Sequence, residues 1–381
     1  MNLKIKYHPV VEKLVKLITE NHWEEKFEIA IGNAKKKNVS IIDHVTNLDQ
    51  YLDWINKFLY WVPSENTAGQ NIDDHLSAFY FIADQEPVLS LQNKLIPQDK
   101  SESLTPFSQW LVEYSEEMGA FLDSPESLTL ESEQTFYNSP SYNMREYSRP
   151  HGGWKSFNQI FARHFKPGFR PIAAIADQSI VTAPADATFV GQWEIRKDSN
   201  VTVKGINWKI CELMDESPYK DCFENGLFIH AYLSPTDYHR IHAPVGGRVL
   251  EARIIPGQVY LEVEAAPVSI NSSKHHLKLK RNFDSPDNLG YQFSQTRGLI
   301  VLDSPIGRVA VIPVGMCQVS SVIITAEEDV VLRKGEELAY FQFGGSDVIL
   351  LFESATNMSI SAQPNVHYKV GNKIGQAYPV I

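Results

Sequence analysis

The spacing of the apolar residues changes partway along this chain, and that change limits the folds open to it. Near the start, residues such as Val11, Leu14 and Ile18 recur at the spacing of one helix face. Later, short runs rich in Val and Ile are separated by Gly, Pro, Asn and Asp, which is typical of short antiparallel strands. The chain is therefore predicted to be an α+β protein, with a helical N-terminal domain over 1–145 and an antiparallel β-rich domain, sandwich- or barrel-like, over 146–381.

Two further windows repeat the helical spacing, "VTNLDQYLDWINKFLYWV" (45–62) and "TPFSQWLVEYSEEMGAFL" (105–122). Thr105 and Pro106 suit the N-cap and the first turn of the second of these helices. The segment 122–153, which is rich in Ser, Pro, Asn and Gly, then interrupts the periodicity. Such a segment marks the expected boundary between the domains.

After this boundary one more amphipathic helix is predicted, over 156–165, and from there on only strands. Because no helices of the kind needed for parallel crossovers intervene, the strands are expected to pair antiparallel. The predicted strand segments are "SIVTAPADATFVGQWEI", "NGLFIHAYL", "GGRVLEARIIPGQVYLEV", "GLIVLDSPIGRVAVIPVG", "SSVIITA" and "DVILLFES".

The net charge and the cysteine content indicate which partners and which cellular compartment to expect. The 35 Lys and Arg against 46 Asp and Glu give a net charge of −11, which argues against a nucleic-acid partner, because such binding requires neutralising phosphates. Cys211, Cys222 and Cys317 show no disulfide or metal spacing, so reduced thiols and a cytoplasmic location are expected.

The chain shows neither a signal peptide nor a run of about 18 apolar residues that would span a membrane. Any membrane contact is therefore expected from the surface. The amphipathic stripe near the N-terminus is the candidate for such contact. Its opposite face is not strongly basic, however, so packing into the core is the favoured interpretation.

The stretch "YLSPTDYHRIHAPVGG" (232–247) holds two histidines within a β-rich region. Ser234 suits a helix cap and Pro235 a first helical position, so a single helical turn is predicted that turns His239 and His242 the same way. Two imidazoles could move protons near neutral pH, or they could be structural histidines bonded to strand ends. A zinc site would need two further ligands at a recognisable spacing, so no metal is expected.

The stretch "FQFGGSDVILLFE" (341–353) contains a buried-strand pattern that is entered through Gly-Gly-Ser-Asp. These four residues contribute little to a sheet. Taken alone, they indicate a turn, because Gly supplies unusual backbone angles and Ser and Asp form local hydrogen bonds.

Five segments together resemble the phosphatidylserine decarboxylase family, from about residue 150 to the C-terminus. The helical N-terminal half and the Phe-Gly-Gly-Ser sequence look more like the branch that contains soluble decarboxylases of free aromatic amino acids, including a tryptophan decarboxylase. The segments that carry the resemblance are "FNQIFARHFKPGFRPI", "APADATFVG", "YLSPTDYHRIHAPVGG", "VIPVGMCQVSSV" and "KGEELAYFQFGGSDVILLFE".

The resemblance implies that the chain cuts itself between Gly345 and Ser346 and converts Ser346 into a covalent pyruvoyl group, its only cofactor. It also implies that His242 is the base for this cleavage and that Asp186 orients His242. With Ser346 as the nucleophile, the three residues would act as a Ser-His-Asp catalytic triad. The pyruvoyl carbonyl would then condense with the substrate amine and accept the electrons released with carbon dioxide. His239 and His242 are the candidates to protonate the resulting carbanion.

The sequence departs from the family pattern at three positions. Asp347 replaces the usual Thr after the serine, which would put a negative charge beside the reacting hydroxyl. Ala187 stands where the family has Gly in its Ala-Asp-Gly element, so the backbone turn there is expected to differ. An Asn-Glu-Arg element is only partly kept, as Gln-Thr-Arg ending at Arg297.

The function implied is conversion of phosphatidylserine to phosphatidylethanolamine, with a phospholipid substrate, peripheral membrane contact and a homo-oligomer of processed chains. Three alternatives stay open. The substrate is instead a free L-amino acid such as tryptophan; the chain is a non-processing relative that acts as a binding module, which Asp347 would explain; or His239 and His242 belong to a metal enzyme.

Overall fold

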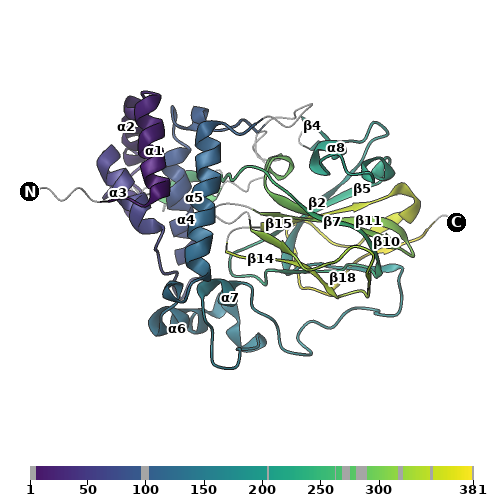
Figure 1. Ribbon diagram of the computed structural model, residues 1–381. Coiled ribbons are helices and arrows are strands. Elements are labelled where there is room, and N and C mark those ends of the chain that lie inside the picture. The colour runs from purple at the N-terminus through teal and green to yellow at the C-terminus, as the bar shows by residue number, and fades with distance from the viewer. Residues whose placement is uncertain are drawn as a thin grey trace, which may run out of the picture.

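The computed structural model describes residues 6–95, 103–203, 206–261, 263–267, 275–279, 290–315, 321–343 and 346–379. The helices of the first half of the chain gather on one side of the molecule and the β-sheets on the other (Figure 1). One hydrophobic core extends from the helices into the sheets. Across this junction the ring of Phe343 lies 6.1 Å from that of Trp61. The division into domains at residue 145 stays a prediction.

The helices predicted from the apolar spacing are present. The described α-helices are α1 (Pro9–Glu20), α2 (Glu24–Lys35), α3 (Leu48–Phe58), α4 (Asn71–Ala83), α5 (Pro106–Asp123), α6 (Leu130–Asn138), α7 (Phe157–Phe161) and α8 (Ile210–Leu213). The prediction for the start of α5 is confirmed, because the Thr105 side chain accepts a hydrogen bond from the Ser108 N–H and Pro106 occupies the first turn.

The apolar face of α1 is turned into the protein. Val11, Leu14 and Ile18 are buried, and the indole N–H of Trp110 on α5 donates to the carbonyl of Val10 at 2.8 Å. Core packing, the favoured interpretation of this stripe, is therefore confirmed. No helix in the described ranges is both long and apolar enough to cross a bilayer.

The second part of the chain forms antiparallel sheets. The largest has eight strands in the order β13-β7-β10-β11-β15-β5-β2-β17, and the described strands close into no barrel. Two three-stranded sheets, β1-β18-β16 and β12-β14-β6, and the hairpins β3-β4 and β8-β9 complete the set. The strands are β1 (Ile180–Thr182), β2 (Ala187–Glu194), β3 (Asn200–Val203), β4 (Ile206–Lys209), β5 (Leu227–Leu233), β6 (Arg240–His242), β7 (Gly247–Ile255), β8 (Val263–Pro267), β9 (His275–Leu279), β10 (Arg297–Ser304), β11 (Gly307–Gly315), β12 (Val322–Ile324), β13 (Val331–Leu332), β14 (Glu337–Phe341), β15 (Ser346–Phe352), β16 (Met358–Ile360), β17 (His367–Tyr368) and β18 (Lys373–Ala377).

The central strands of the eight-stranded sheet are buried on both faces. Alternate residues of β15 show this, because Val348 and Leu350 belong to the core shared with the helices and the small sheets. Ile349 and Leu351 belong to a second core, which β3, β4 and α8 cover. A central strand buried on both faces reads as a continuous apolar run, and all seven residues of β15 are buried.

Helix α7 is shorter than predicted. It ends at Phe161, whereas the apolar spacing favoured a helix over 156–165. The segment after it is drawn into tertiary contacts, since the Ser148 N–H donates to the His164 carbonyl and Phe165 forms a β-bridge with Tyr147. These partners, Ser148 and Tyr147, belong to an earlier segment of the chain. The spacing of apolar residues within 156–165 carries no information about such contacts, so it could not reveal them.

Candidate functional site

Ser346 begins the central strand β15. Its backbone pairs with Leu233 of β5 and Gly315 of β11, and the residue is 1% exposed. The hydroxyl faces the core shared with the helices, because it lies on the same side of the strand as Val348. Among the described residues no hydrogen-bond partner lies within reach of this hydroxyl. A buried hydroxyl without a partner is costly, so this group calls for a specific explanation, of which a catalytic role is one. Gly345 lies outside the described residues.

His239 also carries a buried polar atom without a partner. Its Nδ1–H donates to the Asp237 carbonyl at 2.9 Å, which leaves Nε2 as the unprotonated nitrogen, and Nε2 has no partner in the described part of the chain. The ring stacks on Phe161 at 3.9 Å. Burial lowers the pKa of His239 well below its ordinary value, and the charge of Arg163 lowers it further. His239 is therefore neutral near pH 7 and able to accept a proton.

His242 lies in different surroundings, and both of its ring nitrogens are occupied. Nδ1–H donates to the Gly335 carbonyl at 2.8 Å, and Nε2 accepts from the Tyr238 hydroxyl at 2.9 Å. Burial lowers the pKa of this ring as well. To act as a base, Nε2 must first exchange the Tyr238 hydroxyl for another proton donor.

The prediction that His239 and His242 face the same way is wrong. Ser234 starts a turn and not a helix, in which the Asp237 N–H donates to the Ser234 carbonyl at 2.9 Å. The chain then runs extended into β6, which pairs with β14. Residues three apart on an extended strand point to opposite faces. Across the described residues, no group of three or more His, Cys, Asp and Glu side chains could hold a metal ion.

Asp186 is held by an arginine. Arg170 binds its carboxylate with two nitrogens, Nε at 2.9 Å and Nη2 at 2.6 Å, and the Val370 N–H donates to it at 2.8 Å. Burial alone would lower the pKa of Arg170, but its bonds to Asp186 and Glu146 raise that pKa above its ordinary value. The direct bond from Asp186 to His242 expected from the sequence is replaced by these contacts. The two residues stay connected through the backbone, because the His242 N–H donates to the Pro184 carbonyl at 2.8 Å.

Asp347 belongs to a polar cluster on the other face of the sheet. Its carboxylate accepts from the Tyr291 hydroxyl and from the Gln292 amide at 3.3 Å, and it faces His230 Nε2 at 3.2 Å. Asp347 is 0% exposed, and its Oδ1 has no partner among the described residues. The residue that departs from the family pattern is thus built into the core one position after Ser346.

We predict that the self-cleavage implied by the family resemblance is faster in Asp347→Asn than in the unmodified chain, by roughly tenfold. Asparagine keeps the shape and an acceptor for Tyr291 but removes the charge that would oppose a developing oxyanion at the neighbouring residue. The time course of chain cleavage after synthesis measures this rate. Tyr291→Phe, which leaves the charge in place, is the control. Slower cleavage in Asp347→Asn than in Tyr291→Phe would mean that the carboxylate assists the reaction.

Several of these partners were missed from the sequence. Arg170, Tyr238 and His230 were not singled out, although His230 interrupts the apolar run "FIHAYL" at a buried position and was the available signal. Arg297, which ends the partly kept Gln-Thr-Arg element, is 4% exposed and lies on β10, two strands from β15, on the face of the sheet that carries Asp347 and not Ser346. It donates to the carbonyls of Leu213, Glu212 and Gln295 at 2.7, 2.7 and 2.8 Å, and burial lowers its pKa to about 10.

Comparison with known proteins shows that the segment containing these residues matches a known protein family. The family model described as phosphatidylserine decarboxylase matches residues 157–376. The match contains Asp186, His239, His242 and Ser346, and it contains the whole of the eight-stranded sheet.

Individual relatives agree with the family model. The chain is 30% identical over 317 residues to phosphatidylserine decarboxylase proenzyme 3 of Schizosaccharomyces pombe, which covers 81% of this chain and 30% of the relative. It is 31% identical to proenzyme 2 of Oryza sativa, over 63% of this chain and 36% of the relative. It is 32% identical to the proenzyme of Geobacillus kaustophilus, over 61% of this chain and 80% of the relative. The chain therefore spans about a third of the first two relatives and most of the third.

Proposed function

The chain belongs to the phosphatidylserine decarboxylase family, and we propose that it is the proenzyme of a pyruvoyl-dependent decarboxylase that converts phosphatidylserine to phosphatidylethanolamine. The observation that carries the proposal is Ser346, a buried serine at the start of a central strand whose hydroxyl has no partner among the described residues. Two glycines precede it in the sequence, and because glycine has no β-carbon, neither of them brings a side chain that could hinder attack on the Gly345 carbonyl.

The proposed maturation uses atoms of this chain and one water molecule. The Ser346 oxygen attacks the Gly345 carbonyl carbon, and the peptide bond becomes an ester. Elimination then removes the Cα proton of residue 346, breaks the bond between Cβ and that oxygen, and releases Gly345 as a carboxylate, which leaves a dehydroalanine. Water finally replaces the nitrogen of residue 346, which leaves as ammonia, and a pyruvoyl group remains. When formed, this group supplies a carbonyl that takes up the electron pair released with carbon dioxide.

We propose separate roles for the two histidines. His242 removes the proton from Ser346 during cleavage. Asp186 supports it through the backbone, because the His242 N–H donates to the carbonyl of Pro184, two residues before Asp186. His239 passes a proton to the carbanion during decarboxylation, and its Nε2 must first take up that proton, because the neutral ring carries its only proton on Nδ1. The unpartnered Nε2 of His239 and the neutral state of His242 support these assignments. We further propose a cytoplasmic enzyme that meets the membrane at its surface and assembles as a homo-oligomer of processed chains.

We predict that the purified protein consists of two chains, the smaller one residues 346–381, whose N-terminus is blocked by pyruvoyl. Intact-mass analysis measures both chains, and borohydride reduction in the presence of substrate labels the small one. The control is Ser346→Ala, which has no hydroxyl and should stay a single chain. An unmodified protein that stays in one piece and takes up no label would refute the proposed enzyme.

The same preparation tests the substrate. Carbon dioxide release should be measured with phosphatidylserine vesicles and, separately, with tryptophan, phenylalanine and tyrosine. We expect turnover on the vesicles. Cleavage of the chain followed by turnover of the free amino acids alone would keep the decarboxylase and replace its substrate.

A further inference from the structure

The segment just before the proposed cut is bound by two helices. The Phe343 N–H donates to Oδ1 of Asn158 at 3.0 Å, and Phe343 is two residues before Gly345 in the sequence. Asn158 lies on α7 and is 3% exposed. Its Nδ2 donates in turn to the carboxylate of Asp123, the last residue of α5, at 3.0 Å. Asp123 thus orients the Asn158 amide, and that amide holds the backbone of Phe343.

The neighbouring residue, Gln342, is attached to the same carboxylate. Its Nε2 donates to both oxygens of Asp123, at 3.0 and 3.1 Å, and its Oε1 accepts from the Ser321 hydroxyl at 2.7 Å. Asp123 therefore holds two successive residues, Gln342 directly and Phe343 through Asn158. The three side chains of Asp123, Asn158 and Gln342 form a clamp on the segment that precedes the proposed cut.

The ring of Phe343 fixes this segment further. It is 0% exposed and lies edge-on to Phe157 at 5.1 Å and to Phe161 at 5.7 Å. Phe161 also stacks on His239. A shift of Phe343 would therefore disturb the surroundings of His239 as well as the bond to be cut.

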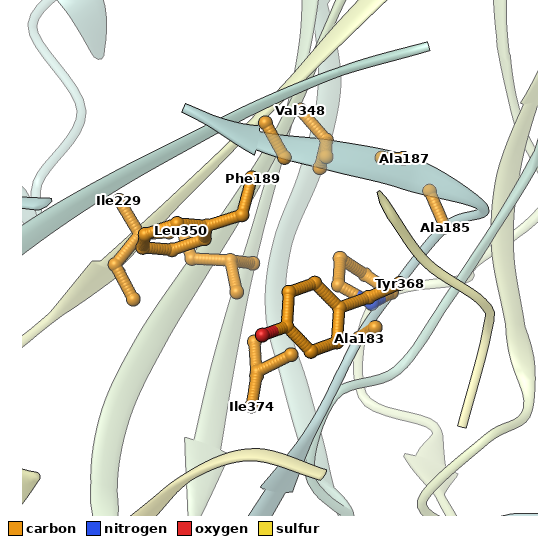
Figure 2. A pocket seen from close by; sticks show the side chains of 11 residues that line it. Ala183, Ala185, Ala187, Phe189, Ile229, Val348, Leu350, Tyr368 and Ile374 are labelled. Carbon is orange, nitrogen blue, oxygen red and sulfur yellow. The ribbon is translucent and has the colours of Figure 1, made fainter. Parts of the chain in front are cut away.

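The residues after the proposed cut are held separately, by the sheet. Ser346 pairs with β5 on one side and with β11 on the other. Further along the same strand, Val348 and Leu350 line the apolar cavity of Figure 2 together with side chains of β2 and β5. The attacking hydroxyl therefore starts from a fixed strand.

Only Gly344 and Gly345 separate these two anchored ends. Glycine restricts its own backbone less than any other residue, so the anchors must bring the Gly345 carbonyl within reach of the Ser346 oxygen. Misplacing a reacting group by about 1 Å can cost about 10²-fold in rate. We propose that Asn158 is a positioning residue for the self-cleavage and that Asp123 orients it, an inference that rests on the proposed function. The clamp couples the cut to the docking of α5 against the β-rich part of the chain.

Exchanging the two side chains tests the clamp. Asn158→Asp keeps an acceptor for the Phe343 N–H but puts two carboxylates in contact, so we expect the chain to cut itself about 10- to 100-fold more slowly. Adding Asp123→Asn restores one amide and one carboxylate in exchanged positions. The double variant should therefore cut within about threefold of the unmodified rate. Intact mass, followed over time after synthesis, measures cleavage.

Asn93→Ala is the matched control for Asn158→Ala. The Oδ1 of Asn93 also accepts a backbone N–H, that of Thr105 at 2.8 Å, but at the opposite end of α5. We expect Asn158→Ala to slow cleavage at least about tenfold and Asn93→Ala to leave it unchanged. Thermal unfolding of both variants, measured in the uncut Ser346→Ala chain, shows whether they fold.

Hydrogen exchange of the Phe343 N–H gives a readout that does not require cleavage. In the Ser346→Ala chain this N–H should exchange faster after Asn158→Asp, and the added Asp123→Asn should slow it again. Because Asp123 lies at the surface, its substitution is expected to leave the fold intact.

The outcomes separate this inference from the proposed function. If the unmodified chain cuts itself and Asn158→Asp cuts equally fast, or if Asp123→Asn does not rescue a slow Asn158→Asp chain, the clamp is overturned and the decarboxylase stands. An unmodified chain that is never cut would refute the proposed function, and the positioning role of Asn158 would fall with it.

Discussion

Replacing His242 with alanine is expected to leave the chain uncut, whereas His239→Ala should still cut itself, at least in part. The cut His239→Ala enzyme should release carbon dioxide about 10²- to 10⁴-fold more slowly, the usual contribution of a positioned acid or base. The two substitutions should separate the steps because the rings lie in different surroundings, His239 against Phe161 and His242 between Tyr238 and Gly335. Intact mass reports cleavage, and carbon dioxide release per pyruvoyl group reports the second reaction.

His239→Gln and His242→Gln are the controls for packing, because glutamine retains hydrogen-bonding capacity without acting as a base. The opposite pattern, a cut His242→Ala and an uncut His239→Ala, would transfer the role of cleavage base to His239. Its unpartnered Nε2 would then be the atom that takes the Ser346 proton.

Arg170→Met is expected to lower the free energy of unfolding by about 3–5 kcal/mol, because it leaves the buried Asp186 carboxylate without its cation. Both side chains are almost fully buried, at 2% and 4% exposure. Denaturant unfolding should be measured on the Ser346→Ala chain, so that a single uncut chain unfolds. Adding Asp186→Asn to Arg170→Met should restore part of the loss, because the unpaired charge is then gone.

Arg196→Met provides the matched control for this experiment. Arg196 pairs with Asp198 at 3.7 Å, but both side chains are more than half exposed, and exposed ion pairs contribute about 0–1 kcal/mol. If Arg170→Met costs no more than Arg196→Met, the buried contact with Asp186 does not hold this part of the site together.

Patterns of neighbouring residues were sufficient to predict most helices and strands of this fold. The predictions that were wrong concern segments whose conformation depends on contacts with distant parts of the chain. Thr105 and Pro106 fix the start of α5 through their own backbone neighbours, so the sequence alone was sufficient. Ser234, Pro235 and Asp237 suit a helix cap and a turn equally well. Pairing of β6 with β14, about a hundred residues later in the chain, selected the turn.

The candidate site divides in the same way. Ser346, His239, His242 and Asp186 could be named from motifs, whereas their contacts could not. Arg170 reaches Asp186 across 16 residues, and Tyr291 reaches Asp347 across 56. No periodicity in the sequence encodes such contacts, because they depend on which strands become neighbours in the sheet. The unpartnered atoms of Ser346 and His239 likewise become visible only once every neighbour is in place.

Because β15 lies at the centre of the sheet, the two pieces left by the proposed cut would not readily refold together after denaturation. Residues 346–381 contribute β15, β16, β17 and β18, and three of these strands pair with strands from earlier in the chain. The severed piece would be retained by hydrogen bonds and packing alone, as an inseparable subunit. Once denatured, the two pieces would have to meet again by diffusion, and the exposed central strand would be prone to aggregation. If the chain is cut as proposed, the intact precursor would therefore serve as the template on which the mature enzyme is assembled, and slow unfolding would be what keeps the mature enzyme intact.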